Sequence, residues 1–268
     1  MVRVGVVGCG TIGSQLALAI QRSYSSVARI TVLHDTNRTH AVTLQRRLAS
    51  HPRIVSLSTL LQRSDLVLEA ASADLAATLV PQALRQHRNL LVMSVGGLLR
   101  STAWQRLARR SHGKVYIPSG ALAGLDGVKA MAIGRITKLS LTTSKPPRAL
   151  AGAPYVQRQK LRLDRLRRPS VIFEGSPRAV VRAFPQNTNV AAALALASGQ
   201  WGARARIRVV ADPSLRRNQH EVDVEGDCGR IRCTIQSVPS ENPKTSELAV
   251  RSAVATLERI FGVVAIGT

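Results

Sequence analysis

The chain has 268 residues, with 38 Lys and Arg against 15 Asp and Glu, and a formal net charge of +23. Its apolar fraction of 45% is ordinary for a globular protein, and no run reaches the roughly 18 to 20 apolar residues of a membrane span. The length suits one large domain or two modest ones. Glycines interrupt the apolar stretch after Arg3 and no small-residue cleavage site follows it. We therefore expect a cytoplasmic protein.

Arginine supplies most of the positive charge, because lysine occurs at only six positions. A basic surplus suggests nucleic acid, but the arginines are spread out, and three Tyr, three Phe and two Trp leave little for base stacking. We expect no nucleic-acid partner and attribute the charge to composition and to attraction of an anionic substrate. Three cysteines without C-x-x-C spacing predict neither a metal site nor a disulfide framework.

The most informative segment runs from Arg3 to Ile20. An apolar run leads directly into GCGTIG (8–13), and a helical pattern follows, which is the order strand, tight turn, helix N-terminus. Gly8 would make the turn, Gly10 would let the backbone approach a pyrophosphate, and Gly13 would allow close packing. Helix N–H groups and the helix dipole then favour phosphate. The sequence predicts an NAD or NADP site with these contacts: Gly8, Gly10, Thr11, Ile12 and Gly13.

Strands and helices alternate over residues 1–119, which predicts an α/β, Rossmann-type domain with a parallel sheet. The expected strands are Arg3–Gly8, Ala28–His34, Ile54–Leu57, Asp65–Ala70, Leu90–Ser94 and Lys114–Ile117. The expected helices are Thr11–Arg22, Thr39–Ala49, Ala73–Gln86 and Ser101–Arg110.

Asp35 ends the second expected strand, about twenty residues beyond the glycine turn, where a carboxylate accepts from a ribose 2′-OH. It would repel a 2′-phosphate and favour NAD, whereas Arg38 nearby would weaken that preference. Alternatively, Asp35 only shapes an Asp-Thr-Asn turn. Ala71 and Ser72 follow the expected strand Asp65–Ala70 and should border the cofactor. Alternatively, these small residues only form a loop.

After Pro118 the strict alternation of strands and helices ends, and residues 120–240 are predicted to form an α+β domain. We expect an open, mostly antiparallel sheet with helices on one face, serving catalysis, substrate binding and oligomerisation. Residues 241–268 should return to the first domain, with a helix over 245–261. The expected elements are helices at 122–133 and 189–198, strands at 137–144, 171–174 and 204–209, a helix capped by Ser176, and a hairpin of 218–225 with 230–237.

His220 opens an alternating strand after a polar loop and should face a cleft. A histidine there could act as an acid or base near neutral pH. The alternative is a structural or solvated histidine.

Nine strings together resemble the L-aspartate dehydrogenases, and the resemblance covers nearly the whole chain. They are GCGTIG (8–13), EAAS (69–72), SVGGL (94–98), PSGALAGLDG (118–127), TTSKPP (142–147), IFEGS (172–176), FPQNTNVAA (184–192), ADPSLRRNQHEV (211–222) and ENPKTS (241–246). Many oxidoreductases share the glycine motif; the combination of IFEGS, N-x-N-V-A-A, N-x-H-E and NPKTS is far more specific.

The resemblance implies reversible oxidative deamination of L-aspartate with NAD or NADP, giving iminoaspartate and then oxaloacetate plus ammonia. It also implies a link to NAD biosynthesis. By motif, His220 matches the catalytic histidine, and Ala121 and Asn189 match contacts of the nicotinamide cofactor. We further expect a homodimer or higher homo-oligomer.

A dicarboxylate substrate needs cationic or N–H donors. Lys244 and Thr245 are candidates, although they could instead start the final helix after an Asn242 cap. Other readings stay open. The chain could be another two-domain NAD(P) oxidoreductase, similar to homoserine dehydrogenase or dihydrodipicolinate reductase, or a non-catalytic cofactor sensor that binds nucleic acid.

Overall fold

The computed structural model describes residues 1–185, 189–240 and 246–267, which form two compact units. The first unit comprises Met1–Pro118 and Val250–Ile266, and the second comprises Ser119–Ala249 with Gly267. Each unit has its own hydrophobic core.

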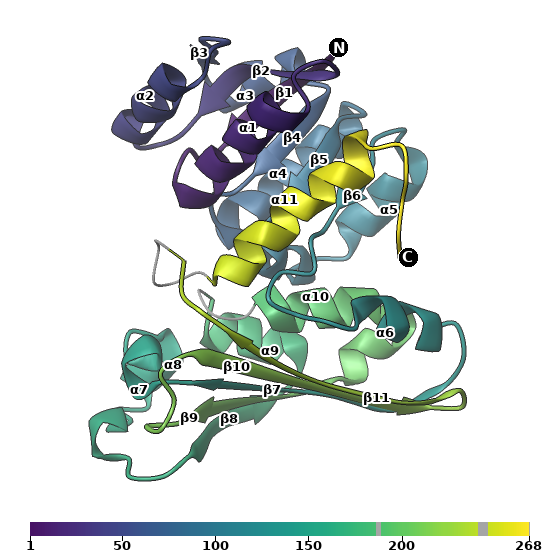
Figure 1. Ribbon diagram of the computed structural model, residues 1–268. Coiled ribbons are helices and arrows are strands. Elements are labelled where there is room, and N and C mark those ends of the chain that lie inside the picture. The colour runs from purple at the N-terminus through teal and green to yellow at the C-terminus, as the bar shows by residue number, and fades with distance from the viewer. Residues whose placement is uncertain (186–188, 241–245, 268) are drawn as a thin grey trace. The chain divides into compact units, whose positions relative to one another are not determined.

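The first unit alternates strands with helices along the chain (Figure 1). Its strands are β1 (Val2–Val7), β2 (Ala28–His34), β3 (Arg53–Ile54), β4 (Leu66–Glu69), β5 (Asn89–Val92) and β6 (Val115–Tyr116). Its helices are α1 (Thr11–Ser23), α2 (Arg38–Arg47), α3 (Leu57–Arg63), α4 (Ala73–Arg85), the 3₁₀ helix η1 (Val95–Leu99), α5 (Ala103–Arg110) and, at the end of the chain, α11 (Glu247–Phe261).

The six strands pair in parallel in the order β3-β2-β1-β4-β5-β6. This is the order of a dinucleotide-binding fold, in which the crevice lies where the strand order reverses, beyond the carboxyl end of the first strand. Residues 4–7 of β1 and nearly all of β4 and β5 are buried, as expected for a parallel sheet covered on both faces. The expected Rossmann-type domain is confirmed.

One expected strand is wrong. Instead of a strand over 54–57, β3 ends at Ile54, and Leu57 begins α3. The Ser56 side chain caps this helix by accepting from the Thr59 N–H. Leu57, Leu60 and Leu61 then have the spacing of one helix face, a signal that the expected strand overlooked.

The C-terminal helix α11 packs within the first unit (Figure 1). Ala253 and Leu257 are fully buried in the same core as Leu16 of α1. The Tyr24 hydroxyl donates to Glu258 Oε2 at 2.6 Å. Residues more than 200 positions apart therefore help to build one core.

The second unit contains a five-stranded sheet and several short helices (Figure 1). Its strands are β7 (Ile136–Lys145), β8 (Ser170–Gly175), β9 (Arg206–Ala211), β10 (Asn218–Gly226) and β11 (Gly229–Ser237). Its helices are α6 (Leu125–Met131), α7 (Pro147–Leu150), α8 (Pro154–Arg158), η2 (Leu163–Arg165), α9 (Pro177–Ala183), α10 (Asn189–Ala197) and η3 (Gly199–Arg204). The expected cap of Ser176 on α9 is present, accepting from the Ala179 N–H.

The strand order of this sheet is β11-β10-β7-β9-β8. Every pairing is antiparallel except that of β7 with β9, so the expected mostly antiparallel sheet is confirmed. Helices α6, α9 and α10 cover one face (Figure 1).

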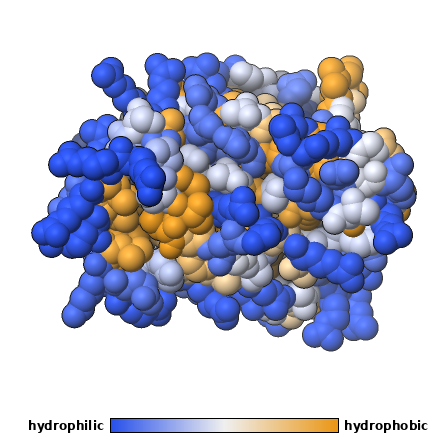
Figure 2. Space-filling view, turned by 90° about the horizontal axis from the view of Figure 1, so that it is seen from below, coloured by the Kyte–Doolittle hydropathy of each residue, from blue (hydrophilic) through white to orange (hydrophobic). Residues whose placement is uncertain are grey.

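Figure 2 views the opposite face, where hydrophilic surface surrounds a smaller apolar area. Charged side chains of neighbouring strands pair on the exposed positions: Lys138, Arg230 and Arg232 with Asp223, and Arg206 and Arg208 with Glu174. Part of the arginine surplus is thus used in ion pairs between strands.

In the part of the chain that the structure describes, no helix is both long enough and apolar enough to cross a membrane.

Candidate active site

The glycine turn joins β1 to α1 in the first unit. Gly8 has φ of 88°, a left-handed conformation, and a Cβ there would lie 2.6 Å from the Ala70 carbonyl oxygen. A Cβ at Gly13 would collide with the carbonyl of Gly8. The fold itself therefore requires glycine at both positions, as the sequence predicted.

Gly10 differs, because no atom lies within 4 Å of the Cβ that a larger residue would place there. Its φ of −70° is open to any residue, so neither packing nor conformation demands glycine. Gly10 is also the N-cap of α1, without a side-chain cap, and the first helical turn contains no acidic residue. This open, uncapped helix start suits a group that needs close backbone approach and N–H donors, which is what a dinucleotide pyrophosphate needs.

Asp35 follows β2 and is hydrogen-bonded through both carboxylate oxygens. Oδ2 accepts from the Cys9 N–H at 2.7 Å, and Oδ1 accepts from the Asn37 N–H at 2.7 Å. Asp35 therefore fixes the glycine turn as well as its own turn. Each carboxylate oxygen can accept more than one hydrogen bond, so these contacts are compatible with a ribose hydroxyl.

The ends of β4 and β5 are joined through Glu69, whose side chain is completely buried. Its carboxylate accepts from the N–H groups of Ala71 and Ser94 and from the Ser94 hydroxyl, all at 2.8 to 2.9 Å. Burial raises the pKa of Glu69, while these hydrogen bonds oppose that rise. Ala71 and Ser72 are exposed just beyond it, and the Ser72 side chain also caps α4.

In the second unit, His220 is 3% exposed on β10 and faces Thr143 of β7. Thr143 Oγ1 lies 2.9 Å from His220 Nδ1. Burial, and secondarily the charge of Lys145, lower the pKa of His220 to about 3. The imidazole is therefore neutral at pH 7, rather than titrating near neutrality as the sequence suggested.

Lys145 ends β7 and is 5% exposed, and its burial lowers its pKa to about 8. It lines a cavity of about 670 Å³, which we call the lysine pocket. Among the described residues of its lining, every ionisable side chain is cationic: Lys145, Arg148, Arg216 and Arg217. The remaining lining residues are Pro146, Ala149, Gly152, Ala153, Pro154, Phe184, Pro185, Asn218 and Pro239. The lysine pocket therefore suits an anionic ligand.

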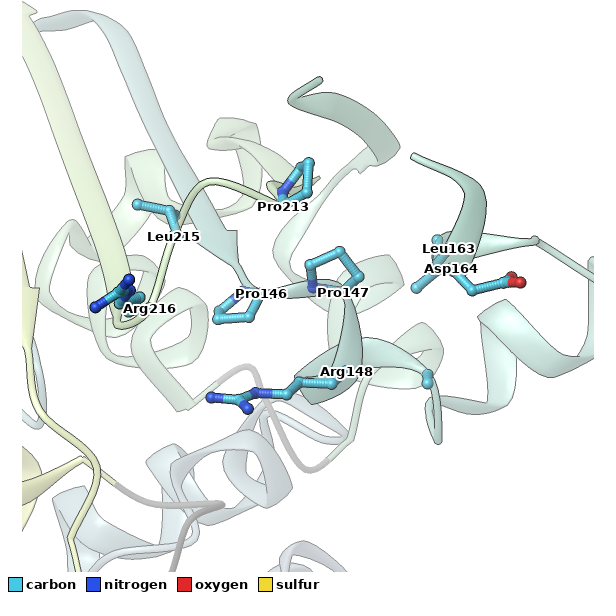
Figure 3. A pocket seen from close by; sticks show the side chains of 9 residues that line it. Pro146, Pro147, Arg148, Leu163, Asp164, Pro213, Leu215 and Arg216 are labelled. Atoms are coloured by element: carbon cyan, nitrogen blue, oxygen red, sulfur yellow. The ribbon is translucent and has the colours of Figure 1, made fainter. Parts of the chain in front are cut away.

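A neighbouring hollow of about 620 Å³, the proline pocket, shares Pro146, Arg148 and Arg216 with the lysine pocket. Figure 3 shows Arg148 and Arg216 on one side of it, with Asp164 on the other side and pointing away from them. The Asp164 carboxylate bonds to Arg162 instead. The two shared arginines are thus not neutralised by the acidic residue of the proline pocket.

The other predicted site residues have different positions. Ala121 is 4% exposed within the core of the second unit, and Asn189 is exposed at the start of α10. Lys244 and Thr245, with the suggested Asn242 cap, lie outside the described residues. Among the residues that are described, no group of three or more His, Cys, Asp or Glu could bind a metal ion.

Sequence reasoning missed three residues of the second unit that belong to the candidate site: Thr143, Lys145 and Arg148. The TTSKPP string contains two of them, and Lys145 is one of only six lysines in an arginine-rich chain. The rarity of lysine in this chain is a signal that could have drawn attention to Lys145. The burial of Lys145, however, depends on strand pairing, which the sequence does not show. Arg216 and Arg217, which directly precede the N-x-H-E motif in the sequence, also line the lysine pocket.

Comparison with known proteins identifies the family. A family model described as "Aspartate dehydrogenase, C-terminal" matches residues 126–260. The L-aspartate dehydrogenase of Methanosarcina barkeri is 42% identical over 100% of both chains. The chain belongs to the L-aspartate dehydrogenase family. The L-aspartate dehydrogenase of Nitrosopumilus maritimus is 37% identical over 97% of this chain and 96% of its own.

A second family model, described as "Homoserine dehydrogenase, NAD binding domain", matches residues 8–118 of this L-aspartate dehydrogenase family member. It covers the glycine turn and the parallel sheet, so NAD(P) binding is assigned to the first unit. Among solved structures, aspartate dehydrogenase from Thermotoga maritima matches 100% of both chains, with a TM-score of 0.72 and 23% identity. That likeness supports the fold.

Proposed function

We propose that this chain oxidises L-aspartate to iminoaspartate with NAD or NADP, after which hydrolysis yields oxaloacetate and ammonia. The observation that carries the proposal is a neutral, buried His220 held by Thr143, close to a pocket lined by cations. A dicarboxylate is the kind of substrate that such a lining attracts. Family membership gives this chemistry its specific substrate.

The proposed role of His220 follows from its tautomer. A neutral imidazole has one N–H, and when Nδ1–H donates to Thr143 Oγ1, the lone pair remains on Nε2. Among the described residues, no hydrogen bond to Nε2 is found. Nε2 is then the base that takes a proton from the substrate amine and releases it to solvent. Once it is free again, it takes a proton from the water that attacks the imine and returns that proton to the departing ammonia. The redox chemistry would come from the nicotinamide cofactor, a hydride acceptor for the substrate α-carbon.

The first unit would bind the cofactor. Gly10 and the start of α1 fit its pyrophosphate, and Asp35 fits the adenosine ribose, favouring NAD over NADP. Arg38, the first residue of α2, would weaken that preference. The remaining proposed cofactor contacts are Gly8, Thr11, Ile12, Gly13, Ala71 and Ser72 in the first unit, together with Ala121 and Asn189 of the second unit.

Homo-oligomerisation is also proposed, with the uncovered sheet face of the second unit as its surface. The ion pairs between its strands place both acidic and basic side chains on that face, and a second copy of the chain could pair with either. A place in NAD biosynthesis, a cytoplasmic location and substrate contacts from Lys244 and Thr245 stay predictions.

The test is an initial-rate comparison of the purified chain. NADH or NADPH formation is followed with L-aspartate and with L-homoserine, and the reverse reaction with oxaloacetate plus ammonia. We expect turnover with L-aspartate, a preference for NAD, and little with homoserine. The assay with L-homoserine is included because the first unit matches the NAD-binding domain model of homoserine dehydrogenase. Turnover of homoserine alone would contradict the proposal.

A further inference from the structure

The helix-covered face of the second sheet changes from apolar to polar side chains toward one end. Leu139 and Leu141 of β7, with Val222 and Val224 of β10, are apolar and buried. Because side chains alternate along a strand, the next positions on the same face are Thr143 and Lys145 of β7, and His220 and Asn218 of β10. Strand pairing places Thr143 opposite His220, and Ser144 opposite Gln219. Lys145 thus lies one row beyond His220, in the row of Asn218.

This polar end is deeply buried. Thr143, Lys145, His220 and Ser237 are each at most 5% exposed. Strand pairing puts Ser237 of β11 opposite Asn218, and its hydroxyl has no hydrogen-bond partner among the described residues. Burying a lysine or an unpaired hydroxyl is costly, and such groups concentrate where a ligand binds.

Lys145 is the ionisable residue of this polar end that opens into the lysine pocket. Asn218 lines that pocket with it, and Arg148, Arg216 and Arg217 add positive charge, while no described residue of the lining is acidic. An anion in the pocket would therefore meet one deeply buried ammonium and a cationic wall. Lys145 is also close enough to His220 for its charge to affect the histidine.

We propose that Lys145 binds a carboxylate of the substrate, so that His220 acts on a molecule anchored one row away on the same sheet face. The inference rests on the proposed function. Binding of a carboxylate would offset the ammonium charge beside His220. It would thereby raise the pKa of the imidazole and strengthen it as a base once substrate is present.

Lys145→Met tests the proposal, because methionine has a similar length without the charge. Lys129→Met is the matched control, since Lys129 is an exposed lysine of α6. We expect the KM for L-aspartate to rise at least 10-fold in K145M, with NADH affinity within twofold of wild type. K129M should behave as wild type. A KM within twofold of wild type in a folded K145M would overturn the proposal.

A binding measurement separates this proposal from the proposed function. Malonate is an inert dicarboxylate, and calorimetry should detect its binding to wild type and K129M but not to K145M. If wild type binds malonate through Lys145 yet never oxidises L-aspartate, the proposed function fails and the carboxylate site stands. Equal malonate affinity in wild type and K145M would refute the site, whatever the activity.

Labelling of the unmutated protein covers the case in which K145M does not fold. Acetic anhydride modifies neutral amines, and the lowered pKa of Lys145 makes it neutral more often than an ordinary lysine. Malonate should reduce acetylation of Lys145, measured by peptide mass spectrometry, and leave Lys129 unchanged. A carboxylate contact at Lys145 would be contradicted if malonate protected neither lysine from acetylation, or if it protected Lys145 and Lys129 equally.

Discussion

Thr143 and His220 face each other across β7 and β10, with Thr143 Oγ1 2.9 Å from His220 Nδ1. The contact is buried, and the direction of its hydrogen bond decides which ring nitrogen has a lone pair. If Nδ1–H donates to the hydroxyl, Nε2 is a base. If the hydroxyl donates to Nδ1, the proton is on Nε2 and the base is lost. Thr143 is in this account a positioning residue.

Replacement of the hydroxyl tests that role. Thr143→Val keeps the shape of the side chain and removes the hydrogen bond, so kcat should fall about 10-fold, the equivalent of about 1.4 kcal/mol. Thr143→Ser retains the hydroxyl and should recover most of kcat. A purely structural role for Thr143 predicts instead that kcat is unchanged in any variant that folds.

Substitution of Asp35 tests its contact with ribose. Asp35→Asn removes the negative charge but keeps an acceptor for the Cys9 N–H, so the glycine turn should survive. We expect weaker NAD binding and a smaller preference for NAD over NADP, measured from kcat/KM with each cofactor. The same preference in wild type and D35N would mean that Asp35 only shapes the turns.

Glu69 should contribute to stability through its three acceptor contacts. In Glu69→Gln one carboxylate oxygen becomes an NH₂ group, which cannot accept from the N–H groups that face it. The free energy of unfolding should fall by about 1 to 3 kcal/mol in urea denaturation. Glu225→Gln, at an exposed position, is the control and should be nearly neutral.

The pH dependence of stability follows from the lowered pKa of His220. The folded protein keeps His220 neutral down to about pH 3, whereas an unfolded histidine protonates near its ordinary value of 6.5. Between these values the unfolded state binds more protons, so stability decreases as pH falls from 6.5 toward 3. His220→Gln removes this contribution. Urea titrations at pH 7 and pH 5 should therefore show a smaller loss for H220Q than for wild type.

Local patterns were sufficient for the parallel sheet, the glycine turn and the Ser176 cap. The expected strand at 54–57 failed because a short helix with a serine cap competed with an apolar run. The short helices α7 and α8 begin at Pro147 and Pro154, positions where proline fits a first helical turn as easily as a loop.

The site was less accessible to sequence reasoning. His220 was identified from its motif, but its low pKa results from burial by distant segments. Lys145 and Thr143 come near His220 only through the pairing of β7 with β10, across more than 70 residues. No local pattern encodes that register.

We propose His220 as the base in L-aspartate oxidation. The most direct measurement compares L-aspartate oxidation by wild type and His220→Ala in single-turnover and steady-state assays, with NADH binding measured on the same samples. We expect the rate in H220A to be roughly 10² to 10⁴ lower, with cofactor affinity preserved. A near-normal rate in H220A would contradict the account.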